Sequence, residues 1–171
     1  MRGEVNMKKT TLLLTALVLG LGSPALAVDD NDNLSGIKLC VDDDSFTAGI
    51  GGMDATSGKV AQGLYDYFVA QAAAKKIKIE ELGAQTCSDY AVALDFSATT
   101  GTPRAWYGSI NVYDSTSYFS PKTTDTYKQP VSVWSSAYYG VLQNNDGLSD
   151  FLTSQGKSII DEFLKAYLSV N

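Results

Sequence analysis

The hydrophobic positions near the C-terminus recur at the spacing of an amphipathic helix. Between Leu148 and Leu168, apolar side chains fall three and four residues apart, and charged or polar side chains take most of the remaining positions. This pattern gathers the apolar side chains into one stripe, which a helix buries against another layer. The sequence therefore predicts a closing helix that packs on a sheet. The apolar positions are Leu148, Phe151, Leu152, Ile159, Ile160, Phe163, Leu164, Tyr167 and Leu168.

A second helical stripe lies nearer the N-terminus, over residues 60–72. Its apolar positions recur every four residues, which places them on one side of a helix. Asp54, Thr56 and Ser57 are each suited to cap a helix start, so we expect the helix to begin there. The basic run 75–78 marks its end, where positive charge complements the helix dipole.

Five segments alternate apolar and polar residues with the period of a strand and are rich in β-branched or aromatic residues. The third and fourth are separated by the turn-forming run 99–103, which predicts an antiparallel hairpin. A polar stretch, residues 115–129, is the longest expected loop, and Asn144–Gly147 turns the chain into the closing helix. The expected strands are 37–41, 76–82, 90–96, 106–113 and 131–141.

These elements predict a single α+β domain over residues 37–171. We expect two layers: a mixed or mostly antiparallel sheet of about five strands, and two helices packed on one face of it. Residues 28–36 are polar and acidic, which predicts a flexible N-terminus before the domain.

Residues 1–27 have the three parts of a secretory signal peptide. Met7–Lys9 is a charged start, Leu12–Leu21 a short apolar core and Pro24–Ala27 a small-residue cleavage region. We expect cleavage after Ala27; an uncleaved amphipathic anchor is the alternative. The apolar run Leu12–Leu21 is too short for a stable membrane span. For the mature chain we expect no membrane insertion. This predicts export to the periplasm or the cell exterior.

Charge narrows the classes of partner. Removing residues 1–27 takes away three of the 13 basic and one of the 19 acidic residues, which leaves a net charge of −8. An acidic protein of this kind is repelled by phosphates and anionic lipids, so we expect no nucleic-acid partner. The only basic cluster, residues 75–78, is interpreted as part of a helix end.

Two cysteines remain after export, Cys40 and Cys87. An even number of cysteines in an oxidising compartment predicts a disulfide between them. A redox-active pair is the alternative, but the two residues lack the close CxxC spacing of such sites. A metal pair finds little support, because the chain has no histidine.

Three aspartates, Asp42, Asp43 and Asp44, directly follow the first expected strand and precede a glycine-rich turn, residues 48–52. This order is common in ligand-binding α/β sites, but Asp54 stands where a dinucleotide fingerprint needs its last glycine. The three aspartates are therefore only weak candidates for a cation site, and a solvated acidic loop is the alternative. No cofactor is expected.

Aromatic residues on two strands suggest a binding surface. Tyr107 and Tyr113 fall opposite the apolar face that includes Trp106, and Trp134 and Tyr138 fall opposite the valines of the last strand. We predict an exposed aromatic face formed by Tyr107, Tyr113, Trp134 and Tyr138, which would suit sugar stacking or a protein contact. The alternative is that another layer covers these rings.

Catalysis has little support in the sequence. Without histidine, the common general base and the Ser-His and Cys-His nucleophile pairs are absent. A carboxylate pair remains open, with Asp42–Asp44 and Asp95 as the acids to nominate. We expect the protein not to be an enzyme.

The C-terminal residues carry one resemblance. Val133–Ser135, Tyr139–Gly140, Ile160–Phe163 and Tyr167–Asn171 resemble the ends of short exported bacterial proteins of unassigned activity. The architecture is also similar to small periplasmic accessory domains. The C-terminal resemblance carries no activity over. By analogy with the accessory domains, we expect an exported, non-enzymatic binding or assembly module of the cell envelope that acts through protein contacts, with an envelope protein as partner. The alternatives are a small secreted carboxylate-dependent hydrolase and a carbohydrate-binding module; the oligomeric state is left open.

Overall fold

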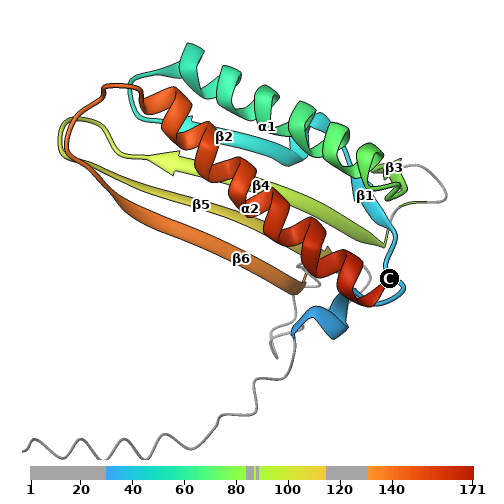
Figure 1. Cartoon of the computed structure of the whole chain (residues 1–171). Coiled ribbons are helices and arrows are strands. Elements are labelled where there is room, and N and C mark those ends of the chain that lie inside the picture. Colours follow the sequence, from blue (N-terminus) through green and yellow to red (C-terminus); the bar gives the residue numbers. More distant parts are fainter. Residues whose placement is uncertain (1–29, 84–86, 88, 115–130) are drawn as a thin grey trace, which may run out of the picture.

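The computed structural model describes residues 30–83, 87, 89–114 and 131–171 (Figure 1). The expected signal peptide, residues 1–27, and the expected loop, residues 115–129, lie outside the described residues. Among those described, no helix is long and apolar enough to cross a bilayer. The elements in chain order are η1 (Asp30–Leu34), β1 (Leu39–Val41), η2 (Asp43–Ser45), β2 (Phe46–Ile50), α1 (Asp54–Ala74), β3 (Ile79–Glu81), β4 (Tyr90–Ala98), β5 (Arg104–Asp114), β6 (Val131–Leu142) and α2 (Leu148–Val170).

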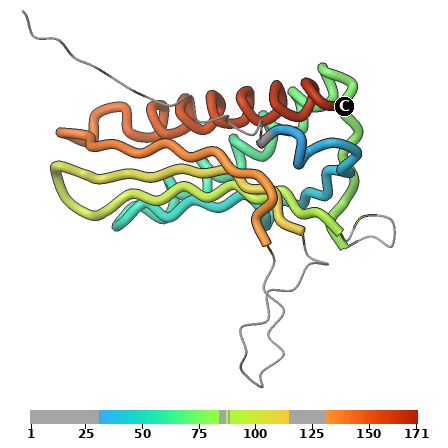
Figure 2. Tube along the Cα trace, turned by 90° about the horizontal axis from the view of Figure 1, so that it is seen from below, coloured from blue at the N-terminus to red at the C-terminus, as the bar shows by residue number. Residues whose placement is uncertain are grey.

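Within the described residues, the sheet is mixed and has six strands. Its order is β3-β1-β4-β5-β6, and β2 pairs with β4 beyond the end of β1. The pairs that β1 makes with β3 and β4 are parallel, as is the β2·β4 pair, whereas β4·β5 and β5·β6 are antiparallel. Both helices lie on one side of the sheet (Figures 1 and 2). The predicted fold class, a two-layer α+β domain, is confirmed.

The expected glycine-rich turn over residues 48–52 is wrong in its first half. Phe46 and Ile50 are 3% and 2% exposed, and the exposed Thr47 and Gly49 alternate with them, so residues 46–50 form β2 beside β4. Only Gly51 and Gly52 turn the chain into α1, and Gly52 has φ +74°. Thr47, Ala48 and Gly49 are small, so the period-two pattern of this segment is weak in the sequence. The two buried side chains, Phe46 and Ile50, are enough to fix the strand against the core.

The core lies between the sheet and the two helices. Phe68 of α1 and Phe163 of α2 are fully buried, and their ring centroids are 6.1 Å apart. The helices touch where Leu64 of α1 packs on Gly156 of α2. Because the apolar stripe of each helix is confined to one side, that side of each helix faces the sheet.

The expected flexible N-terminus is also wrong for its described part. Residues 30–34 form the short helix η1, and Leu34 is fully buried in the core. The side chain of Asn171 donates a hydrogen bond to the Leu34 carbonyl oxygen at 2.9 Å. Asn33 Nδ2 donates to the Val133 carbonyl oxygen of β6 at 3.1 Å. One buried leucine and these amide contacts hold a segment whose composition alone predicts mobility.

Candidate functional site

One face of the sheet is covered by α1 and α2, and no described element covers the other (Figure 2). Trp106 and Trp134 point to the helices, because their ring centroids lie 5.4 Å from Phe151 and 5.2 Å from Phe163. Since side chains alternate along a strand, Ala105 and Tyr107 beside Trp106, and Ser135 after Trp134, point to the uncovered side. We call this side the open face.

Two tyrosines meet on the open face. Tyr107 of β5 lies directly opposite Tyr139 of β6 in the register of the two strands, and the next pair on the same face is Ala105 and Val141. Tyr139 is 82% exposed, Val141 59% and Tyr107 43%. Large apolar side chains are rarely so exposed next to one another unless they form a contact surface. Tyr107, Tyr139 and Val141 are called the tyrosine patch below.

The surroundings of the patch are polar but almost uncharged. In the described strands β2, β4, β5 and β6, Asp95 is the only charged residue whose side chain points to the open face. Its carboxylate accepts a hydrogen bond from Thr47 Oγ1 at 2.7 Å. Depletion of charge around tyrosines is the composition that marks the centre of protein interfaces. The remaining side chains of the face around the patch are Ser97, Ser109, Asn111, Tyr113, Ser135 and Ala137.

A shallow hollow adjoins the patch. It has a volume of about 300 Å³. Ser97, Thr99 and Ala105 line it together with Tyr107. The hollow lies where the β4–β5 hairpin begins to turn, and its lining includes one tyrosine and two hydroxyl-bearing residues.

The predicted aromatic face is half right. Tyr107 and Tyr113 point to the open face, but Trp134 and Tyr138 point to the helices, so the four residues do not form one surface. The physical reason is a β-bulge: Val112 pairs with Trp134 but Tyr113 pairs with Ser132, which leaves Val133 unpaired. A bulge adds one residue to the strand and so reverses which side the later side chains face. The orientation of Val131 at the start of β6 therefore does not predict the orientation of the residues after the bulge.

The two misassigned aromatics are held from the helix side. Trp134 is 7% exposed, and its Nε1 donates a hydrogen bond to Asn31 Oδ1 at 3.1 Å. The Tyr138 hydroxyl donates to Glu162 Oε2 at 2.8 Å. This hydrogen bond, with burial and the negative charge of Glu162, raises the pKa of Tyr138. The sequence signal for the true patch was the alternation of Tyr139 and Val141 with Tyr138 and Gly140 beyond the bulge.

The aspartates nominated for a cation site or for catalysis have other partners or lie in solvent. Asp42 Oδ1 accepts hydrogen bonds from Ser45 N at 2.7 Å and from Ser45 Oγ at 2.6 Å, which caps η2. Asp43 and Asp44 are exposed in η2. In the described part of the chain, no group of three or more Asp, Glu, Cys or His side chains is placed to hold a metal ion.

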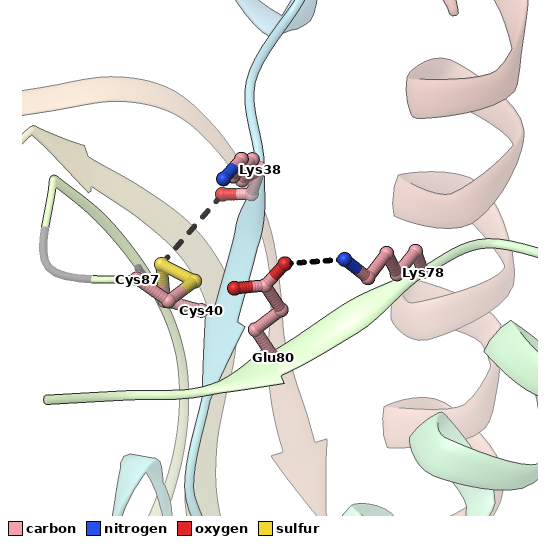
Figure 3. A network of polar contacts seen from close by, with 5 residues as sticks. All are labelled: Lys38, Cys40, Lys78, Glu80 and Cys87. Carbon is pink, nitrogen blue, oxygen red and sulfur yellow. Dashed lines mark hydrogen bonds and ion pairs between the residues drawn. A yellow bond between two sulfur atoms is a disulfide. The ribbon is translucent and has the colours of Figure 1, made fainter. Parts of the chain in front are cut away.

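Asp42 and Asp43 do border a second, more acidic cleft of about 400 Å³ at the ends of β1 and β3. Glu80 and Glu81 complete its acidic rim. Glu80 is already engaged, since Lys78 Nζ lies 2.7 Å from its carboxylate (Figure 3). Lys78 therefore compensates the charge of one of the four acidic residues that line this cleft.

The predicted disulfide between Cys40 and Cys87 is confirmed (Figure 3). It joins β1 to the residues just before β4, and both cysteines are almost fully buried, at 1% and 2% exposure. Burial of both sulfur atoms indicates a structural crosslink.

A larger cleft, of about 730 Å³, lies where β2 and β4 end and α1 begins. Arg104 stands behind its wall. This arginine is 4% exposed and donates hydrogen bonds to the carbonyl oxygens of Gly51 and Thr99 and to Asn145 Oδ1. Its guanidinium thus ties three turns together and is occupied by structural partners.

Comparison with protein-family models, with curated proteins and with solved structures finds no significant match to this chain. The resemblance of residues 133–171 to short exported bacterial proteins stays a prediction.

Proposed function

We propose that this chain is an exported, non-enzymatic binding module of the bacterial cell envelope that holds a protein partner on its open face. The tyrosine patch is the observation that carries the proposal. Tyr107 and Tyr139 form an exposed cross-strand pair on a face with one charged residue in the described strands β2, β4, β5 and β6. The buried disulfide and the signal-peptide pattern support export.

The chemistry of the patch favours a protein surface as ligand. Tyrosine supplies a large, rigid contact area and loses little conformational entropy on binding, and serine and asparagine add adaptable hydrogen bonds. The hollow beside Tyr107 is large enough for one side chain of the partner. Hot spots of protein interfaces are typically aromatic residues next to such pockets.

A carbohydrate-binding module is the second candidate, and the same hollow favours it. Ser97 and Thr99 line the hollow together with Tyr107, a combination of hydroxyl-bearing residues and an aromatic ring that suits a stacked sugar. Thr99 Oγ1 already accepts a hydrogen bond from Ala105 N at 3.0 Å, which leaves its hydroxyl proton for a ligand. A glycan would be held mainly by Tyr107, whereas a protein partner would contact Tyr139 and Val141 as well.

The test is capture from envelope extract by the exported protein with its disulfide formed, followed by binding measurements with the purified partner. Tyr139→Ala and Tyr107→Ala are each expected to weaken binding at least about tenfold, as for interface hot spots. Leu168→Ala is the matched control, because Leu168 is an exposed apolar residue on α2, at 45% exposure. It should bind as the unmodified protein does.

Three results would contradict the proposal. Retention of the partner by both tyrosine variants would place the contact elsewhere. Binding of a glycan array that is lost in Tyr107→Ala but kept in Tyr139→Ala would favour the carbohydrate candidate. Hydrolysis of a substrate that depends on Asp42, Asp43 or Asp95 would favour the carboxylate-dependent hydrolase.

A further inference from the structure

The outer edge of β6 is a long strand edge that is unpaired over most of its described length. β6 is the last strand in the sheet order and has 12 residues, Val131–Leu142. η1 reaches its beginning, where Asn33 donates to the Val133 carbonyl oxygen. From residue 135 to residue 142, no strand in the described part of the chain pairs with the outer side. Alternate backbone N–H and C=O groups there are available to another strand.

This edge lacks the features that usually keep edges from pairing. Residues 131–142 contain no charged residue and no proline. The opposite edge differs, since β3 has only three residues and two of them are Glu80 and Glu81. Charged side chains and short length prevent pairing at natural sheet edges. One edge of this sheet is thus protected in the usual way, and the other is long and uncharged.

We propose that β6 pairs antiparallel with β6 of a second copy of this chain, about a two-fold axis at Tyr139. In this register Tyr139 faces its own counterpart, and Ala137 faces Val141 on the open face. On the helix face Tyr138 faces Gly140. Each of the latter pairs sets a larger side chain against a smaller one, so the strand is complementary to itself over residues 136–142.

Charge favours a second copy over another extended segment. The protein is acidic, with a net charge of −6 over the full sequence, so most contacts between two copies are repulsive. The free part of β6 has no charged residue of its own, so on its open face two acidic copies can meet without opposed carboxylates. On the open face of this strand, a basic segment of another protein would find no carboxylate to select it. On the helix face the one adjoining carboxylate, Glu162, already accepts hydrogen bonds from Ser136 and Tyr138.

The pairing has a geometric consequence. An antiparallel pair of identical strands is related by an axis perpendicular to the sheet, so both open faces lie on the same side. The two tyrosine patches would then adjoin at the centre of one continuous sheet. The pairing rests on the edge of β6 alone and stands whether or not the open face binds a partner.

Sedimentation equilibrium of the exported protein is the first test, with the expected result a concentration-dependent dimer. Ala137→Lys brings positive charges close to the axis and is expected to weaken dimerisation at least about tenfold. Ser97→Lys is the matched control, because Ser97 is an exposed small residue on the open face of β4, away from the edge. It should leave the dimer unchanged.

Crosslinking tests the register. Tyr139→Cys places two thiols opposite each other across the axis, where cross-strand Cβ atoms are about 5 Å apart, and oxidation should give a covalent dimer. Ser97→Cys should stay monomeric under denaturing conditions. A protein that is monomeric at every concentration would overturn the proposal. A dimer that is insensitive to Ala137→Lys and that does not crosslink through position 139 would overturn it as well.

Discussion

Gly156 sets how closely α2 approaches α1. A Cβ atom added at this position would lie 2.6 Å from both Cδ atoms of Leu64 and 3.1 Å from its Cγ. Leu64 is fully buried, so its side chain has no free volume to move into. Gly63 on α1 differs, because an added Cβ there meets nothing within 4 Å. Both glycines lie inside helices, so replacing either by alanine gives the same gain in backbone entropy. The two positions differ only in what the added methyl group contacts.

We therefore predict opposite effects of the same substitution at these two positions. Gly156→Ala should lower the free energy of unfolding by about 1–3 kcal/mol, because it overpacks the contact between the helices. Gly63→Ala should raise it by about 0.5–1 kcal/mol, because alanine favours the helix. Urea unfolding of both variants measures the difference. Equal changes of the free energy of unfolding in the same direction would show that contact with Leu64 does not limit how closely α2 approaches α1.

Single residues are also where the sequence is least informative. Arginine is almost never buried without a partner, and no pattern around Arg104 marks it as a core residue. It is buried because three turns that are distant in sequence bring Gly51, Thr99 and Asn145 to one place. No local pattern contains that information. The disulfide was predictable because a chain with a signal-peptide pattern and only two cysteines leaves one pairing.

Among the elements, α2 is the best predicted and the best anchored. The expected helix over residues 148–168 matches Leu148–Val170, because its stripe is long and regular. β2 and the bulge in β6 were missed because strand pairing decides both, and pairing partners are far apart in sequence. The tyrosine patch was therefore predicted in part: Tyr107 lies on a strand without a bulge of its own, whereas Tyr139 lies beyond the bulge in β6.

Polar contacts hold α2 to the neighbouring elements. The Tyr67 hydroxyl of α1 donates to both carboxylate oxygens of Asp161, and the Tyr138 hydroxyl of β6 donates to Glu162. Tyr167 donates to the Ile37 carbonyl oxygen at 2.8 Å. Burial raises the pKa of Tyr67 and Tyr167, and the hydrogen bond and negative charge of Asp161 raise that of Tyr67 further. The pKa of Tyr138 is raised mainly by its hydrogen bond to Glu162.

These shifts predict a loss of stability at alkaline pH. A tyrosine whose pKa is higher in the folded state stabilises the fold below its ordinary pKa of 10.0 and loses this contribution as the pH rises above it. The free energy of unfolding should therefore fall above pH 10.0. A triple variant with phenylalanine at Tyr67, Tyr138 and Tyr167 should show a shallower fall. Urea unfolding over a pH series measures both slopes, and equal slopes would contradict the assignment.

The whole molecule has two unlike sides and two unlike edges. The two helices lie on one side of the sheet (Figure 2). The aromatic core and the polar anchors of α2 lie on that side too, and the tyrosine patch lies on the other. The protected edge carries β3, and the long uncharged edge carries β6. A sheet covered on one side only buries less surface than one covered on both, so part of its stability must come from other sources.

The disulfide is one such source, and it fastens the end of the sheet where the strands are shortest. Cys40 and Cys87 are 47 residues apart in sequence, and closing a loop of this length in the unfolded chain is worth about 4 kcal/mol in the chain-entropy model. Reduction should therefore lower the free energy of unfolding by about that amount. Urea unfolding with and without reductant measures the change. The double variant Cys40→Ala with Cys87→Ala is the control, because reductant should not alter its unfolding curve. An unchanged free energy of unfolding after reduction would contradict this prediction. It would mean that the crosslink does not restrict the conformations of the unfolded chain, and that the pairing of β1 with β3 and β4 holds this end of the sheet without it.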